Sequence, residues 1–157
     1  MNLKWARITP GNSTKLAWTG KMSVSNQAID AEHQKLIGLV NEVELAIRTR
    51  NAAALSQVFA LFEDSIREHF RNEAGFAQAI NHPFDEHELE HRYVLGELRI
   101  MREELLPSRG GWSESAAEYY YSFLSEWAIR HISEDDMQMK AKLETYPYDF
   151  IPPDTPK

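Results

Sequence analysis

The sequence predicts an all-α protein, an antiparallel up-down-up-down four-helix bundle, on three observations. Four long segments carry apolar residues at steps of three and four, the period of one face of an α-helix. Short interruptions separate them, as between antiparallel neighbours, and no segment alternates like a strand. Because 157 residues can bury one core, we expect a single domain over residues 1–157, with an irregular N-terminal arm (1–27), the bundle (about 28–145) and a short C-terminal tail (146–157).

The arm precedes the first predicted helix. Pro10, Gly11 and Gly20 interrupt regular structure there, and Trp18 is the side chain expected to anchor the arm to the bundle. The first helix starts near Ala28. Its expected inward residues are Ile29, His33, Leu36, Val40, Val43 and Ile47.

The second predicted helix follows the interruption RTRNAAA and has the most regular pattern, with inward positions that alternate by four and three residues. Asn81, His82 and Pro83 end it, because proline lacks an N–H donor and disfavours a helical residue before it. The chain is expected to fold back there. The inward residues are Leu55, Phe59, Phe62, Ile66, His69, Glu73, Phe76 and Ile80.

The third and fourth helices show the same spacing. The segment LPSRGG ends the third, Ser113 is a suitable N-cap for the fourth, and the fourth fades at YPYDFIPPDTPK. The third carries Phe84, His87, His91, Val94, Leu98, Met101 and Leu105 inward, and the fourth carries Tyr120, Phe123, Leu124, Trp127, His131, Met139 and Leu143.

Composition excludes several classes of protein. The chain has no cysteine, so disulfides, thiolate metal sites and thiol catalysis are excluded, and any metal must be held by nitrogen and oxygen. The net charge of −7 and scattered basic residues argue against a nucleic-acid partner. No apolar run approaches the ~20 residues that cross a bilayer, and the N-terminus lacks the apolar stretch of a signal peptide. We therefore expect no membrane span and a cytoplasmic location.

Each predicted helix places at least one histidine on its inward face. Residues four apart on a helix are offset by ~40° and ~6 Å, so the pairs His69 and Glu73, and His87 and His91, can each point to one place in the core. Separately satisfied core histidines are the alternative. However, burying five imidazoles and a carboxylate without a common partner would cost several kcal/mol. Five nitrogens also exceed the four positions of a tetrahedral zinc, which favours two octahedral ions bridged by carboxylates.

These residues resemble the ligand pattern of the hemerythrins, and specifically of the bacterial single-domain bacteriohemerythrins. Supporting stretches are IDAEHQKL around the first histidine, HF at the second and EWAIRHISEDD around the last. The resemblance covers about residues 18–143. The positions that match the family's metal ligands are His33, His69, Glu73, His87, His91, His131 and Asp136.

The resemblance implies a di-iron centre with an oxo or hydroxo bridge and dioxygen as its ligand. His87, His91 and His131 would bind one iron, and His33 and His69 the other. Glu73 and Asp136 would bridge the two, leaving one open position on the second iron for dioxygen. The family's oxygen pocket would be lined by Trp18, Leu36, Phe70, Trp127 and Ala128, the last standing where a leucine usually closes the pocket.

The step from His131 to Asp136 does not fit a regular helix. Five residues amount to ~500°, about 140° away from the ligand face. A local π-turn or a loosened turn at Ile132 to Asp135 would bring Asp136 back. Asp135, at a four-residue step, is the competing bridge.

The function expected from these features is reversible dioxygen binding, as a carrier, store or local supply. The alternatives are an oxygen or redox sensor that acts through a protein partner, and a di-iron peroxidase or nitric oxide reductase. His82 stands before a proline without a partner at ligand spacing, so we expect it to be exposed and to have no role in the centre.

Overall fold

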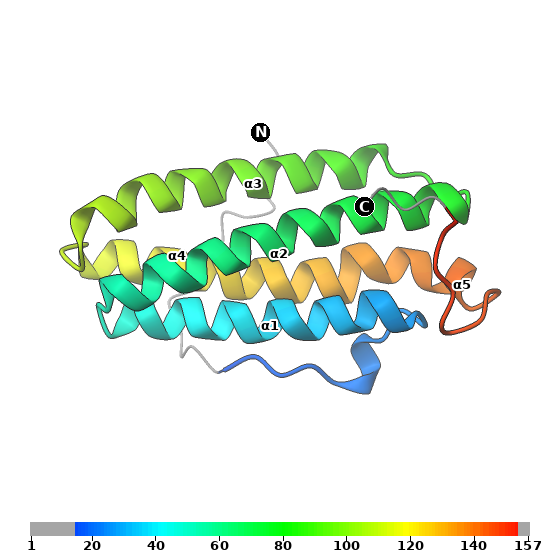
Figure 1. Ribbon diagram of the computed structural model, residues 1–157, viewed down its shortest axis with the longest axis horizontal. Coiled ribbons are helices and arrows are strands. Elements are labelled where there is room, and N and C mark those ends of the chain that lie inside the picture. Colours follow the sequence, from blue (N-terminus) through cyan, green and yellow to red (C-terminus); the bar gives the residue numbers. More distant parts are fainter. Residues whose placement is uncertain (1–14, 154–157) are drawn as a thin grey trace.

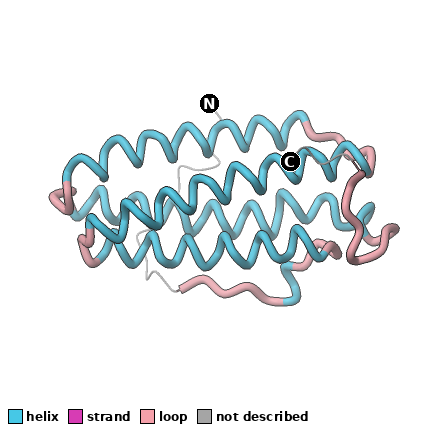
Figure 2. The backbone as a smooth tube through the Cα atoms, viewed as in Figure 1, coloured by secondary structure: helices cyan, strands magenta, loops and turns pink. Residues whose placement is uncertain are grey.

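Four long helices, each antiparallel to the one before it, make up the computed structural model, which describes residues 15–153 (Figure 1). They are α1 (Gln27–Arg48), α2 (Ala52–Ala79), α3 (Asp85–Leu105) and α4 (Glu114–Arg130). Short elements are η2 (Gly20–Met22), η3 (Leu106–Ser108), η4 (His131–Asp135), η5 (Asp136–Met139) and α5 (Lys140–Leu143). Short loops join the long helices (Figure 2), and no strand occurs within residues 15–153. The predicted all-α four-helix fold is confirmed.

The helix ends follow local sequence signals. The side chains of Asn26, Asn51 and Ser113 each accept a hydrogen bond from a backbone N–H in the first turn of the helix that follows. Ser113 is therefore the N-cap predicted for α4. After α2 the backbone turns through Asn81, whose φ of 56° is left-handed, and Pro83 follows before α3 begins.

The predicted inward faces are buried, with Phe84 half-buried at the start of α3. Their apolar residues form a large cluster towards the α1–α2 loop and a smaller one at the opposite end, which includes Ile29, Phe76 and Met139. The core histidines lie along the helices between these two clusters. On α1, for example, His33 stands between Ile29 of the small cluster and Leu36 of the large one.

The arm and the tail both pack on α1. The backbone of Leu16 exchanges two hydrogen bonds with the side chain of Asn41, at 2.9 and 2.8 Å, which fixes the arm along the helix. At the opposite end, the carbonyl of Tyr148 accepts a bond of 2.8 Å from the backbone of Gln27, and that of Phe150 accepts one from Asn26. The tail, for which the sequence indicated no role, thus closes this end of the bundle.

The outer parts of the predicted arm and tail, residues 1–14 and 154–157, lie outside the described residues. None of the helices within residues 15–153 combines the length and the apolar character needed to span a membrane.

Candidate metal centre

Five histidines and two carboxylates meet in the buried middle of the bundle. Their ligand atoms form two overlapping groups of five, and within each group all atoms lie within 4.8 Å of one another. All seven side chains are less than a tenth exposed. The first group is His33, His69, Glu73, His131 and Asp136, and the second is Glu73, His87, His91, His131 and Asp136.

Each carboxylate has one oxygen near each group. Oε1 of Glu73 lies 2.8 Å from Nε2 of His69, and Oε2 lies 2.9 Å from Nε2 of His91. Oδ2 of Asp136 lies 2.6 Å from Nε2 of His33, and Oδ1 lies 2.8 Å from Nε2 of His87. This is the placement that two bridging carboxylates require.

His131 lies between the two groups. Its Nε2 is 2.9 Å from Oδ2 of Asp136 and 3.3 Å from Oε1 of Glu73, the two oxygens that also lie nearest to His33 and His69. It nevertheless belongs to both groups. The assignment of His131 to the ion held by His87 and His91, which the resemblance implies, stays a prediction.

A π-helix joins His131 to Asp136. The five residues of η4, His131–Asp135, take the wider π turn, which adds the rotation that a regular helix lacks at a five-residue step. Asp136 is consequently fully buried in the cluster, whereas Asp135 is half-buried and in neither group. The turn predicted from the spacing is confirmed, and Asp136 is the better placed of the two candidate bridges.

Opposite charges in the cluster shift the pKa values of its histidines. Burial lowers the pKa of an imidazole, yet the close contacts of its Nε2 with Asp136 at 2.8 Å and with Glu73 at 3.5 Å raise the pKa of His87 to about 10. Against the same effect of burial, the charges of Asp136 and Glu73 raise the pKa of His131 to about 9. Burial also lowers the pKa of His69. The charge of Glu73 and the close contacts of the His69 imidazole with the carboxylates of Asp136, Glu32 and Glu73 outweigh this effect and hold the pKa well above the ordinary value.

The carboxylates shift in the opposite direction. Burial alone raises the pKa of Glu73, but the charges of His69 and His131 hold it well below the ordinary value. Burial and the charge of Glu73 oppose ionisation of Asp136, and contacts with His131 nevertheless lower its pKa. Both carboxylates are thus ionised at neutral pH and available as metal ligands.

The chemistry of the donor atoms fits a pair of cations. The distances from Nε2 of His87 and His91 to the carboxylates are short, but the atoms are not aligned as donor and acceptor. These two nitrogens and both oxygens of Glu73 have no hydrogen bond of normal geometry within residues 15–153. In addition, the Nε2 atoms of His69 and His131 face each other at 3.0 Å, an arrangement that needs a proton or a cation between the two lone pairs. Atoms aimed at a common centre are what a metal site provides.

Aromatic rings cover the cluster on the side of the large apolar cluster. Phe70 stacks on His91 with centroids 3.6 Å apart, and Trp127 stacks on His131 at 5.1 Å. Leu36 and Ala128 are buried in the same apolar cluster. The position of Trp18, half-buried in the arm, leaves its predicted place in an oxygen pocket untested, and the pocket roles of the other four also stay predictions.

Sequence reasoning missed two residues that contact the cluster, Glu32 and Asn72, and gave a third, Phe84, only as an inward residue. Oε1 of Glu32 accepts a hydrogen bond from Nδ1 of His69 at 2.9 Å, and Oε2 accepts one from Nδ2 of Asn72 at 2.7 Å. Phe84 stacks on His87 with centroids 4.7 Å apart. Glu32 and Asn72 lie beside the inward stripes, so the helical period gave no signal for them.

His82 takes no part in either group. Its side chain is half-buried rather than exposed. Partial burial, with Lys142 and His87 nearby, lowers its pKa, so it is neutral at neutral pH.

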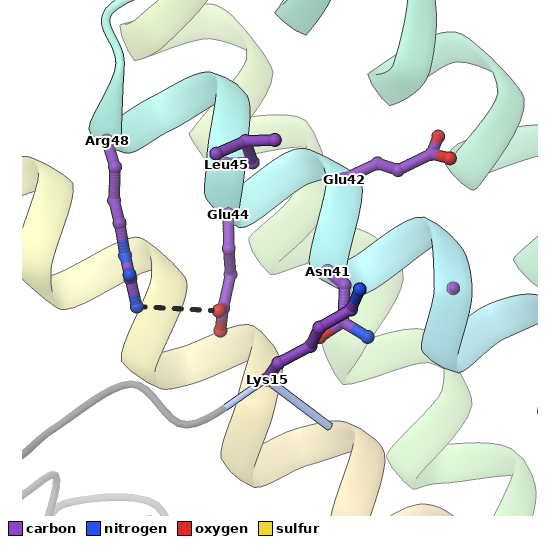
Figure 3. Close-up of a pocket in the computed structure, with 7 residues that line it drawn as sticks. Lys15, Asn41, Glu42, Glu44, Leu45 and Arg48 are labelled. Atoms are coloured by element: carbon purple, nitrogen blue, oxygen red, sulfur yellow. Dashed lines mark ion pairs between the residues drawn. The ribbon is translucent and has the colours of Figure 1, made fainter. Parts of the chain in front are cut away.

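A separate surface pocket lies between the arm and α1 (Figure 3). Two of its charged residues, Glu44 and Arg48, form an ion pair. The buried carboxylate of Glu44 accepts a hydrogen bond from Ser125 and lies 4.0 Å from Arg48, and Asn41 holds the backbone of Leu16. Lys15 of the arm lines this pocket together with residues of α1, and no histidine of residues 15–153 does, so the histidine cluster remains the candidate site.

Comparison with known proteins identifies the family. The family model described as hemerythrin HHE cation binding domain matches residues 24–143, a span that contains all seven residues of the cluster. The chain belongs to the hemerythrin family. This hemerythrin is 31% identical over 128 residues to hemerythrin subunit alpha of Lingula anatina, a match that covers 81% of this chain and 94% of that protein.

Bacterial hemerythrins are also similar to this chain. It is 26% identical over 136 residues to the bacteriohemerythrin of Stenotrophomonas maltophilia, covering 83% of this chain and 86% of that protein. For the bacteriohemerythrin of Pseudomonas aeruginosa the identity is 25% over 121 residues, covering 77% and 76%. The family that the ligand pattern of the sequence resembles is confirmed.

Proposed function

We propose that this hemerythrin holds two iron ions in the histidine cluster and binds dioxygen there reversibly, as a carrier, store or local supply. The observation that carries the proposal is that Glu73 and Asp136 each direct one oxygen towards each of two groups of ligand atoms. Five imidazoles and two carboxylates from the four-helix core are more than one ion uses. Nitrogen and carboxylate donors without thiolates suit iron.

Each residue of the cluster would have a defined role. Glu73 and Asp136 would bridge the ions, His87, His91 and His131 would hold one ion, and His33 and His69 the other. The two irons, when bound, would supply the electrons that dioxygen takes up and returns. The stacked rings of Phe70 and Trp127, with Leu36, would exclude water from this part of the core.

The proposal predicts a reversible spectral change. We expect two irons per chain, and a visible absorption band that appears when anaerobically reduced protein meets air and disappears when oxygen is removed. The measurement is the absorption spectrum before and after air, with iron counted per chain. A chain that binds zinc alone or a single iron would refute the assignment.

Ala128 offers a test of the oxygen pocket. It is 1% exposed and follows Trp127, whose ring stacks on His131. If alanine leaves space here for water or a small anion, Ala128→Leu would fill that space. We expect Ala128→Leu to slow the loss of the oxygenated spectrum severalfold, with iron content unchanged and azide binding weakened.

The alternative is that Ala128 is only a packing residue. Three added carbons in a filled core would then cost about 1–3 kcal/mol of unfolding free energy. Lower stability together with an unchanged decay rate would show that other residues close the pocket.

A further inference from the structure

Glu32 joins α1 to a candidate metal ligand on α2. One of its carboxylate oxygens accepts the hydrogen bond from Nδ1 of His69 at 2.9 Å, and the other accepts the amide of Asn72 at 2.7 Å. Asn72 is three residues beyond His69 on the same helix. The carboxylate is therefore held on both sides against one imidazole.

Among the five cluster histidines, His69 alone has an Nδ1 bonded to a carboxylate within the part of the chain that the structure describes. The contrast is clearest with His33, which the resemblance places on the same ion. Nδ1 of His33 is buried and has no hydrogen-bond partner among the described residues. The two imidazoles assigned to this ion would therefore differ in donor strength.

We propose that Glu32, held in place by Asn72, is a positioning residue that makes His69 the strongest imidazole donor of the centre. This inference rests on the proposed di-iron site. A carboxylate can only accept, so the hydrogen bond keeps the proton of a neutral His69 on Nδ1 and leaves the Nε2 lone pair directed at Glu73 and Asp136. The negative charge of Glu32 also raises the basicity of that nitrogen.

The expected consequence is unequal affinity of the two metal positions. Loss of such an outer partner typically weakens metal binding by about 10–100-fold. Because Glu32 touches only His69 in the cluster, its replacement should weaken the ion held by His33 and His69 and leave the other ion unaffected.

The test uses Co²⁺ and metal-free full-length protein, with binding followed by the visible bands of the ion. Glu32→Gln keeps an oxygen acceptor and the side-chain size but removes the charge, whereas Glu32→Ala removes both. We expect one of two Co²⁺ ions to bind about 10–100-fold more weakly in Glu32→Ala, with its bands shifted. The loss should be smaller in Glu32→Gln, and smaller still in Asn72→Ala, which keeps the carboxylate.

Glu44→Gln is the matched control. Glu44 lies on α1, as Glu32 does, and is 4% exposed. Its carboxylate accepts a hydrogen bond from Ser125, which is not part of the histidine cluster. It should leave both Co²⁺ affinities unchanged. Equal Co²⁺ affinities in wild type, Glu32→Gln and Glu32→Ala would overturn the positioning role. Binding of fewer than two Co²⁺ ions by wild type would instead contradict the proposed di-iron site, and this result does not depend on the variants.

Discussion

The variant Glu73→Ala should lose both iron ions and fall in unfolding free energy by about 3–5 kcal/mol. Glu73 is fully buried, and its oxygens lie 2.8 Å from His69 and 2.9 Å from His91. In the proposed di-iron site its removal would take one carboxylate oxygen from each ion. It would also leave His69, whose pKa is raised in part by the Glu73 charge, without its nearest counter-charge in a buried site. Iron per chain and the urea unfolding curve of the metal-free protein measure the two effects separately.

Glu63→Ala is the matched control for this experiment. Glu63 lies on the same helix, is 7% exposed and pairs with Arg102 at 3.0 Å, outside the cluster. We expect the Glu63→Ala variant to retain full iron content and to lose less unfolding free energy than Glu73→Ala. The side chain of the partner Arg102 is 43% exposed, so water can solvate the charge that is left behind. His82→Ala should change neither property. Normal iron content in Glu73→Ala would refute the bridging role.

Helical periodicity was sufficient to predict the fold and six of the seven members of the cluster, whereas Asp136 was expected only from the resemblance to the hemerythrins. His69 and Glu73 occupy a four-residue step within an otherwise apolar stripe, and such a step places both side chains on the buried face. The structure buries both. The same reasoning holds for His87 and His91 on α3, because the period of a single helix decides which of its side chains share one face.

The break in periodicity at Asp136 was equally informative. A five-residue step predicted either a π turn or a different ligand, and the structure has the π turn at His131–Asp135. Local geometry decided this case, since η4 alone rotates Asp136 towards His131.

Contacts between helices could not be predicted from periodicity. Glu32 and His69 are 37 positions apart, and the hydroxyl of Tyr148 bonds to Asp30 across 118 positions. Which side chains meet in such pairs depends on how the helices rotate and shift against one another, and a hydrophobic stripe fixes rotation only to within its own width. The partners of His69 and the role of the tail therefore required the structure.

Metal affinity should rise steeply with pH between about pH 6 and pH 9. In the metal-free chain the pKa of His87 is raised to about 10 and that of His131 to about 9, and the pKa of His69 is also raised. His87 is therefore protonated at neutral pH, and the facing Nε2 atoms of His69 and His131 share one further proton across their contact of 3.0 Å; both protons must be lost to bind a metal. Each displaced proton contributes about a tenfold change in apparent affinity per pH unit. Proton release, measured as the dependence of binding heat on buffer, should approach two per chain at neutral pH.

The same groups make the stability of the metal-free chain depend on pH. Stabilisation that arises from the raised pKa values of His87 and His131 is complete below their ordinary value of 6.5 and is lost as pH rises through about 9 to about 10. Stabilisation from the lowered pKa values of Glu73 and Asp136 is present above their ordinary values of 4.5 and 3.8 and is lost as pH falls. The metal-free chain should thus be most stable between about pH 4.5 and 6.5.

Bound metal should remove the alkaline part of this dependence, because a coordinated imidazole is already deprotonated. We therefore expect the difference in melting temperature between metal-loaded and metal-free protein to be smallest near pH 6 and to grow steadily towards about pH 9. Thermal unfolding of both forms across this range measures it, and His87→Asn should make the metal-free curve flatter by removing one of the groups with a raised pKa. If the metal-free chain instead became more stable from pH 6.5 to 9, the histidines would not be paired as cations with Glu73 and Asp136, and the cluster would hold neutral imidazoles before metal binds.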